Sequence, residues 1–149
     1  MGIFPEGTIS RAFELSDFKT GAARIAQRAD APLIPCAIWG SQRIWTKELP
    51  RRLGRTHTPV IIRYGAPVSL EGTPEEVTAR LKLAVQELLD ANRAEYEEKY
   101  GPFPEGERWM PASLGGSAPT LEEAEEIYQR EKAERAERKA AKAAAKREK

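Results

Sequence analysis

Cysteine and histidine are nearly absent from this sequence, whose 149 residues include one of each, Cys36 and His57. One cysteine cannot form an internal disulfide or a structural zinc site, so we expect no bound metal and a reducing compartment such as the cytoplasm. We interpret Cys36 as a small buried apolar residue in the apolar segment 32–39. The sequence also lacks any apolar run near the roughly 20 residues that cross a bilayer. A polar turn at residues 5–7 interrupts the start and excludes a signal peptide.

A strong net charge is lacking as well, because 24 basic and 23 acidic residues leave a formal charge of +1. The charge is uneven, since residues 129–149 are almost entirely Ala, Lys, Arg and Glu, with an excess of bases. Such a segment could bind anionic lipid or nucleic acid without specificity. No nucleic-acid recognition motif accompanies it and no apolar face runs along it, so we interpret it as a solvated helix or disordered tail and expect no nucleic-acid partner.

The remaining pattern predicts the α/β class, with a partial sheet flanked by helices and a long charged helix at the C-terminus. Apolar spacing indicates a helix over 18–29 and strands over 33–39 and 59–65. Thr73 begins a further helix, because Pro74 follows it and Glu76 completes a capping box.

Three regions follow from composition. Residues 1–100 have ordinary globular composition, residues 101–119 form a Gly- and Pro-rich linker, and residues 120–149 form the charged tail, opened by a second capping box at Thr120. Ile3 and Phe4 are expected to end a buried strand that starts before residue 1, which indicates an N-terminally truncated chain.

The turn at residues 4–8, Phe-Pro-Glu-Gly-Thr, is the segment most informative about a binding site. Gly7 permits a positive φ and a close backbone approach. Hydroxyls and charges cluster around it, and the amides of a tight turn can bind an anion. The candidate phosphate-binding or head-group-binding residues are Glu6, Gly7, Thr8, Ser10, Arg11 and Lys19. The same residues are also compatible with an ordinary polar turn.

This turn closely resembles the third conserved block of the lysophosphatidic acid acyltransferase family. The segment Phe-Lys-Thr-Gly-Ala at 18–22 resembles the lysine-containing helix start that follows that block, and the apolar segment 31–38 is similar to the fourth block. The resemblance covers residues 3 to about 67. One departure is Ile9, which stands where the family has arginine, with Arg11 two positions later.

The resemblance implies a partial glycerolphosphate acyltransferase-type sheet and an enzyme of phospholipid biosynthesis. Such enzymes transfer an acyl chain from acyl-CoA or acyl carrier protein, a co-substrate and not a cofactor, to lysophosphatidic acid. It implies that Glu6, Gly7 and Thr8 line the glycerol phosphate site and that Lys19 contacts the phosphate. It also implies a peripheral location at the inner, cytoplasmic face of the cell membrane.

The larger departure from the family pattern concerns the catalytic residues. The family's first block is a His, four residues and an Asp, in which the Asp orients the His as general base. Five positions after His57 stands Ile62, so this chain has no such pair. We therefore expect no catalytic residue in the chain, a loop or strand-edge position for His57, and no activity from residues 1–149 alone. The alternative is a non-catalytic remnant that binds a phospholipid head group or a partner protein.

Two further expectations concern surfaces. Trp39, Arg43, Trp45 and the arginines at 51, 52 and 55 form a basic, aromatic set, which suits an anionic membrane surface or an anionic donor, or else a solvated loop. Parallel sheets are normally covered on both faces. Truncation would then leave Phe4, Ile34 and Ile38 uncovered, giving a poorly soluble or partner-dependent protein.

Overall fold

Helix α2, Pro74–Tyr100, is the long central element of this fold. The computed structural model describes residues 1–47 and 49–147, with side chains described as far as residue 142. The predicted capping box is confirmed at the start of α2: the Thr73 hydroxyl accepts from the Glu76 amide at 3.2 Å, and the Glu76 carboxylate accepts from the Thr73 amide at 2.7 Å. These bonds satisfy amides that a helix start otherwise leaves without partners.

The sheet has two strands, β1 (Cys36–Trp39) and β2 (Ile61–Tyr64), which pair antiparallel with Cys36 opposite Tyr64. This pair is therefore not the parallel sheet that the truncation argument assumed. Parallel strands need a long crossover, usually a helix. In the described part of the connection, the helical turn η1 (Ser41–Arg43) is only three residues long. Both strands are shorter than predicted. Pro35 has no amide hydrogen to donate to the ladder, and before Cys36 the two segments are joined by the Gly65 amide, which donates to the Pro35 carbonyl at 3.0 Å, and by an isolated bridge between Leu33 and Val68.

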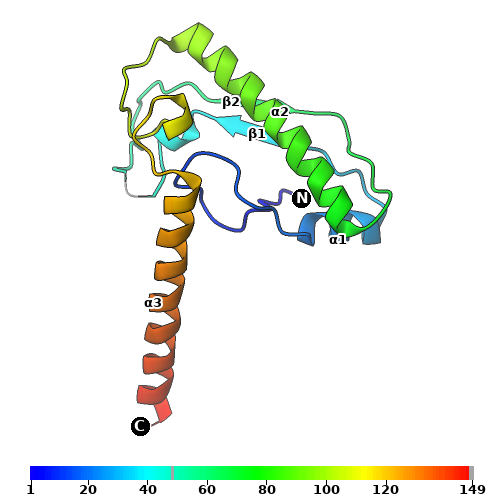
Figure 1. The fold of residues 1–149 in the computed structure, drawn as a ribbon, viewed down its shortest axis with the longest axis vertical. Coiled ribbons are helices and arrows are strands. Elements are labelled where there is room, and N and C mark those ends of the chain that lie inside the picture. Colours follow the sequence, from blue (N-terminus) through cyan, green and yellow to red (C-terminus); the bar gives the residue numbers. More distant parts are fainter. Residues whose placement is uncertain (48, 148–149) are drawn as a thin grey trace.

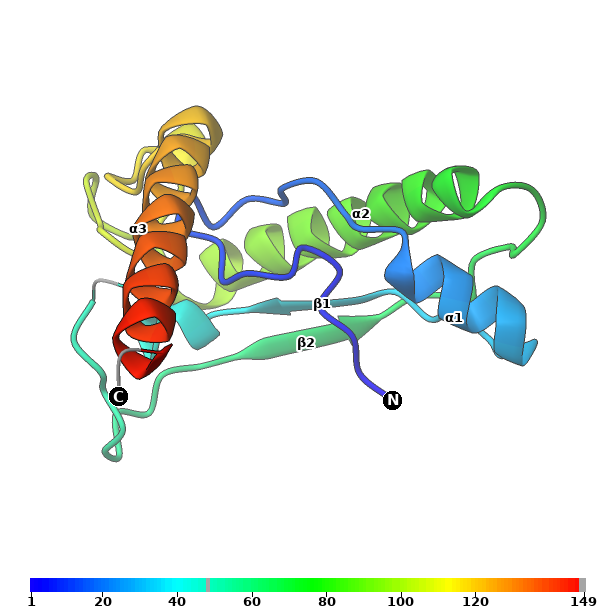
Figure 2. The ribbon, with the colours of Figure 1, turned by 90° about the horizontal axis from the view of Figure 1, so that it is seen from below.

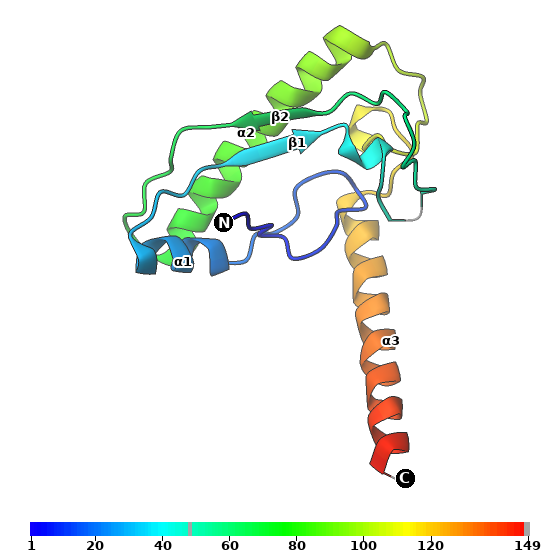
Figure 3. The same cartoon turned by 180° about the vertical axis from the view of Figure 1, so that it is seen from behind.

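One face of the sheet packs against α2 and the other is uncovered (Figure 3). On the covered face, Asn92 of α2 is fully buried, donates to the Ala37 carbonyl at 3.1 Å and accepts from Arg63 at 3.0 Å. On the other face, Ile38 and Ile62 are paired and both exposed. The helix therefore binds both strands through one buried amide, while an apolar face remains in solvent.

The side chains expected to lie uncovered are exposed, at 80% for Phe4, 51% for Ile34 and 39% for Ile38. The expectation that Ile3 and Phe4 end a buried strand is wrong, because both lie in coil and both are exposed. Cys36 is half-buried in β1 and not fully enclosed.

Helix α1, Gly21–Ala29, begins three residues later than predicted. Its buried residues Ala22, Ala23 and Ala26 have side chains small enough to allow close packing, whereas Ile25 is exposed. Figure 2 shows α1 lying beside the first turns of α2. The helix ends at Asp30, which adopts a left-handed conformation and ends the helical hydrogen bonding before Pro32.

Residues 101–119 pack onto the body of the protein and contribute Trp109 and Met110 to its core. Trp109 meets Phe103 at 4.9 Å between ring centroids, and Phe103 stacks on Tyr96 of α2 at 5.6 Å. The guanidinium of Arg43 lies 4.6 Å from the Trp109 ring. The short helix η2, Ala112–Leu114, follows this aromatic cluster.

Helix α3, Leu121–Arg147, projects away from the body (Figure 1). The capping box predicted at Thr120 is confirmed, since its amide donates to the Glu123 carboxylate at 2.9 Å and its hydroxyl accepts from the Glu123 amide at 3.3 Å. Glu148 and Lys149, part of the predicted tail, lie outside the described residues. Among the described helices, none combines the length and apolar content that crossing a bilayer requires.

Candidate functional site

The motif turn is the closed end of a loop that leads into α1. The Gly7 amide donates to the Phe4 carbonyl at 3.1 Å, which closes the turn. The Lys19 amide donates to the Pro5 carbonyl at 2.9 Å. These two bonds bring together the ends of a segment fourteen positions long, so the predicted residues Glu6, Gly7 and Lys19 share one end of the loop.

Gly7 has a φ of +69°, the left-handed region that a side chain disfavours. A Cβ atom added there would lie 2.8 Å from the Lys19 ammonium nitrogen. Glycine is therefore favoured at position 7 for two reasons. It adopts the left-handed turn conformation without strain, and it leaves space for the Lys19 side chain. Among the described residues, no carboxylate forms an ion pair with Lys19, so its charge is available to an anion beside the turn.

Glu6 turns inward and binds Ser16 on the returning arm of the loop. One carboxylate oxygen accepts from the Ser16 amide at 3.0 Å and from its hydroxyl at 2.8 Å. Glu6 therefore has Ser16 of the protein itself as its hydrogen-bond partner. Sequence reasoning missed Ser16, because a contact across ten residues of irregular loop leaves no periodic signal.

Thr8 and Lys47 meet although 39 positions separate them. The Lys47 ammonium donates to the Thr8 hydroxyl at 3.2 Å. Lys47 lies in the basic loop after η1, and sequence reasoning did not assign it to the site. A cation at bonding distance from the motif threonine adds positive charge on the side of the turn that faces α3.

Ser10 and Arg11 have intramolecular partners. The Ser10 hydroxyl donates to the Glu14 carbonyl at 2.9 Å. The Arg11 guanidinium is buried, with 6% of its side chain exposed, and pairs with the carboxylate of Glu131 in α3. Arg11 thus has the charge and fork geometry for phosphate, but in this arrangement it holds a carboxylate.

A cavity of about 40 Å³ remains between this loop and α3. Such a volume suits a single water molecule and is far smaller than the few hundred Å³ of an ordinary ligand pocket. Its wall comes from both elements: Thr8, Ile9, Ser10, Arg11, Ser16, Leu121, Ala124, Glu125 and Tyr128. With α3 in this position, the loop is closed to a ligand on that side.

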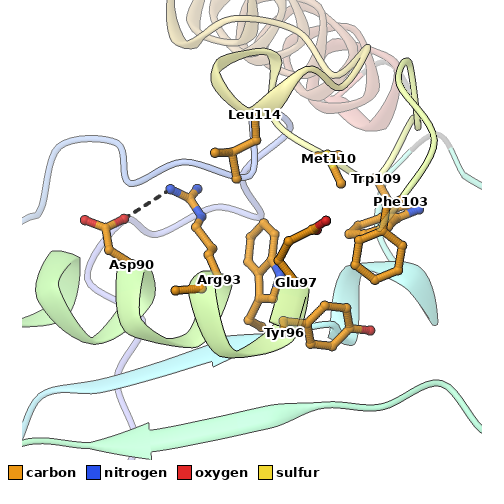
Figure 4. Close-up of a pocket in the computed structure, with 10 residues that line it drawn as sticks. Asp90, Arg93, Tyr96, Glu97, Phe103, Trp109, Met110 and Leu114 are labelled. Atoms are coloured by element: carbon orange, nitrogen blue, oxygen red, sulfur yellow. Dashed lines mark hydrogen bonds and ion pairs between the residues drawn. The ribbon is translucent and has the colours of Figure 1, made fainter. Parts of the chain in front are cut away.

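A larger cavity of about 470 Å³ lies between the second half of α2 and residues 103–114 (Figure 4). Its rings come from the aromatic cluster, and the Arg93 guanidinium donates to Asp90 at 3.4 Å and to the Phe13 carbonyl at 2.7 Å. Burial lowers the pKa of Arg93, and Asp90 partly offsets this effect. None of the residues that line this cavity belongs to the motif.

The basic, aromatic set expected from the sequence is divided in two. Trp39 is buried at 5% exposure and Arg43 lies in the aromatic cluster, so neither belongs to a surface patch. Trp45 is 56% exposed, with the Arg51 guanidinium 4.8 Å from its ring, and Leu53, two positions after Arg51 in the sequence, is 71% exposed.

His57 lies in the exposed loop predicted for it, with a φ of +49°. Among residues 1–47 and 49–147, no group of three or more histidine, cysteine or acidic side chains is arranged to hold a metal ion. The described part of the chain therefore offers the motif turn, with its cations and hydroxyls, as the candidate site.

Gly7→Ala tests the geometry of the turn. We expect the free energy of unfolding to fall by about 1–2 kcal/mol, because the side chain strains the left-handed backbone and meets the Lys19 ammonium. Urea unfolding followed by far-UV circular dichroism measures the change. Gly21→Ala is the matched control, since no atom lies within 4 Å of its added Cβ. Equal stability of the two variants would contradict the assigned role of Gly7.

Comparison with known proteins agrees with the motif. Residues 1–39 match the family model described as Acyltransferase. A 1-acyl-sn-glycerol-3-phosphate acyltransferase of Cocos nucifera is 32% identical over 74 residues, covering 50% of this chain and 23% of that protein. The 1-acyl-sn-glycerol-3-phosphate acyltransferase alpha of Mus musculus is 36% identical over 80 residues, covering 52% of this chain and 27% of that protein.

The matched part is thus about a quarter of the length of each relative. No solved structure matches the chain. The resemblance predicted from residues 4–8 and the segments after them is confirmed: the part of the chain that carries the motif matches the acyltransferase family model, and about half of the chain is similar to 1-acyl-sn-glycerol-3-phosphate acyltransferases.

Proposed function

We propose that this chain forms the glycerol phosphate-binding part of an acyltransferase of phospholipid biosynthesis. In the proposed reaction, the free hydroxyl of 1-acyl-sn-glycerol-3-phosphate attacks the thioester of acyl-CoA or acyl carrier protein. An ester forms, the thiol leaves, and the hydroxyl proton passes to a general base. The names of the two relatives support this acceptor.

One observation supports the binding role above the others: the Lys19 ammonium lies against the Cα of Gly7 in the closed motif turn. A compact ammonium at the surface of a turn is a point charge suited to a phosphate. Glu6, held by Ser16, keeps the turn in shape without pairing with Lys19. In the proposed complex, Lys19 contacts the phosphate, and Glu6, Gly7 and Thr8 line the glycerol.

We further propose that residues 1–149 alone bind the acceptor without turning it over. General-base catalysis needs a titratable group within hydrogen-bond reach of the acceptor hydroxyl. The sequence has one histidine, and His57 is exposed in a loop with Ile62 at the family's Asp spacing. Binding without turnover also fits the alternative function, in which the chain presents a phospholipid head group or serves a partner protein.

The membrane contact that we propose for this protein uses the loop that carries Trp45 and Leu53. Both side chains are exposed, and the Arg51 guanidinium lies beside the Trp45 ring. Aromatic residues prefer the membrane interface, and clustered arginines are attracted to anionic lipid. This loop therefore supports a peripheral position on an anionic membrane, which we propose is the cytoplasmic face of the cell membrane.

Calorimetric titration tests the binding role, with 1-acyl-sn-glycerol-3-phosphate below its micelle concentration and with glycerol 3-phosphate. We expect Lys19→Ala to weaken binding of both about tenfold or more, as loss of a charge-assisted hydrogen bond predicts. Lys99→Ala is the control, because Lys99 lies at the end of α2 and pairs with Glu95. Monoacylglycerol, which lacks the phosphate, should not distinguish the variants.

Two results would contradict the proposal. Equal affinity of Lys19→Ala and the unchanged chain would remove Lys19 from the site. Release of free thiol from acyl-CoA by the purified chain, dependent on the acceptor, would show that residues 1–149 contain a complete catalytic apparatus.

A further inference from the structure

The cavity between the second half of α2 and residues 103–114 has the size of a ligand site. Its volume is about 470 Å³, which lies within the usual range for small-molecule pockets. Most of its lining is apolar or aromatic and comes from β1, α2 and the segment after α2: Trp39, Ala94, Tyr96, Phe103, Trp109, Met110 and Leu114. A ligand that fills this space needs an apolar body, and the faces of the rings attract positive charge.

The polar part of the lining is a single stripe along α2. Asp90, Arg93 and Glu97 stand three and four positions apart, so they share one face of the helix, and all three line the cavity. Figure 4 shows the Glu97 side chain extending from α2 toward Met110 and Trp109. This stripe carries two carboxylates and one guanidinium, which differ in how far a ligand can reach them.

The Arg93 guanidinium is engaged inside the protein. Only 12% of the side chain is exposed, the guanidinium lies 4.9 Å from the Trp39 ring, and it donates to the Phe13 carbonyl at 2.7 Å. Within the described part of the chain, its Nε atom is buried and has no hydrogen-bond partner. A ligand could reach that atom only by displacing protein atoms, so Arg93 offers little positive charge to the cavity.

The two carboxylates are the accessible charges of the stripe. The side chain of Asp90 is 58% exposed, pairs with Arg93 at 3.4 Å and accepts from Gln86 at 2.9 Å. Glu97 is exposed as well. Among the side chains of residues 1–47 and 49–142, none forms a hydrogen bond or an ion pair with the Glu97 carboxylate. A molecule that enters the cavity therefore meets negative charge beside aromatic rings.

Arg43 shows that these rings can hold a cation. Its guanidinium lies 4.6 Å from the Trp109 ring and 5.2 Å from the Phe103 ring. Arg43 is not among the residues that line the cavity, so it makes these contacts from outside. Its charge would repel a second cation in the cavity, and the carboxylates of Asp90 and Glu97 would offset that repulsion.

We propose that this cavity binds an organic ammonium ion with an aromatic or apolar body. The body packs against Phe103, Trp109 and Met110, and the ammonium group lies between the rings and the Glu97 carboxylate. A charge-assisted hydrogen bond and cation–π contacts then act on the same positive group. The site goes beyond the proposed function, because none of its residues belongs to the motif turn.

Three probes that share one phenyl body test the sign of the charge at neutral pH: 2-phenylethylamine, 2-phenylethanol and 3-phenylpropanoate. Titration into the full chain is followed by two-dimensional ¹H–¹⁵N NMR. The indole N–H signals of Trp39 and Trp109 report on the cavity, and that of Trp45 serves as the internal control, because Trp45 does not line it. We expect the amine to shift the first two signals and to bind about tenfold more tightly than the alcohol. The carboxylate should bind more weakly than the alcohol.

Glu97→Gln isolates the proposed contact with the ammonium group. The preference for the amine over the alcohol should fall from about tenfold to about twofold, because the charged acceptor is lost. Glu98→Gln is the matched control, since Glu98 is the next residue of the helix, is exposed and does not line the cavity. Its preference for the amine should match that of the unchanged chain.

Ala94→Phe tests whether the probes occupy the cavity. Ala94 lines the cavity from α2, so the larger side chain should fill part of it and abolish the shifts caused by all three probes. Ala91→Phe makes the same change at an exposed position of α2 that does not line the cavity, and its binding should be unchanged. Circular dichroism should give the same helix content for both variants.

Four results would overturn the inference. Tighter binding of 3-phenylpropanoate than of the amine would mean that Arg93 sets the charge preference. Equal effects of Glu97→Gln and Glu98→Gln would reduce the role of Glu97 to general surface charge. Unchanged binding by a folded Ala94→Phe variant would place the probes elsewhere, and unshifted Trp39 and Trp109 signals with every probe would show that the cavity takes no ligand of this class.

Discussion

Trp109→Ala is expected to lower the free energy of unfolding by about 3–5 kcal/mol, the cost of truncating a large buried ring. Trp109 is 7% exposed and meets three partners: Phe103, Tyr96 and the guanidinium of Arg43. Its loss removes apolar burial, two ring contacts and a cation–π contact together. The melting temperature should fall by on the order of 10 °C.

Trp45→Ala is the matched control, because Trp45 is 56% exposed. We expect its stability to lie within about 0.5 kcal/mol of the unchanged chain, as for most surface substitutions. Urea unfolding followed at 222 nm by circular dichroism compares the two without depending on tryptophan fluorescence. If the two variants unfold at the same urea concentration, Trp109 does not anchor residues 101–119 to the core.

Gly40→Ala should be about as damaging, for a different reason. Gly40 has a φ of +100°, and an added Cβ would lie 2.3 Å from the Pro59 carbonyl oxygen and 2.9 Å from the Tyr96 ring. The strained backbone and the forced repacking together should cost about 2–5 kcal/mol. The clash falls where the Tyr96 hydroxyl donates to Pro59 at 3.0 Å, so that bond should weaken as well.

Gly54→Ala provides the comparison for Gly40, since no atom lies within 4 Å of a Cβ at that position. Thermal unfolding of both variants by circular dichroism should show a large loss for Gly40→Ala and little change for Gly54→Ala. A Gly40→Ala protein that melts with the unchanged chain would mean that the loop after β1 shifts without cost.

Local chemistry made much of this fold predictable. The capping boxes at Thr73 and Thr120 predicted where two helices begin, because each box is complete within four residues. The motif was recognisable for a similar reason, since its five residues are consecutive. The positive φ of Gly7 was expected from its place in that turn.

Contacts between distant segments were not predictable in this way. Arg11 and Glu131 are 120 positions apart, and nothing in the composition of either segment marks them as partners. The aromatic cluster was missed because Phe103 and Trp109 stand among Gly and Pro residues, where no helical or strand period reveals a buried face. The direction of β2 depended on the connection before it, which the spacing of apolar residues does not describe.

Other expectations stay predictions. No observation here tests the domain boundaries at residues 100 and 119, the role of each motif residue toward a substrate, or the acyl donor. The last two can be tested by measuring binding and turnover. The experiment on Lys19 addresses the role of the motif residues directly.

The two-stranded sheet has a consequence for handling the protein. Within the described residues, each strand pairs along one side only, and the outward face carries exposed Ile38 and Ile62. Backbone amides and carbonyls along an unpaired side are a template for a further strand. Any extended segment nearby can add to this sheet, a neighbouring copy of the same chain included. We therefore expect association of the protein to increase with its concentration during preparation.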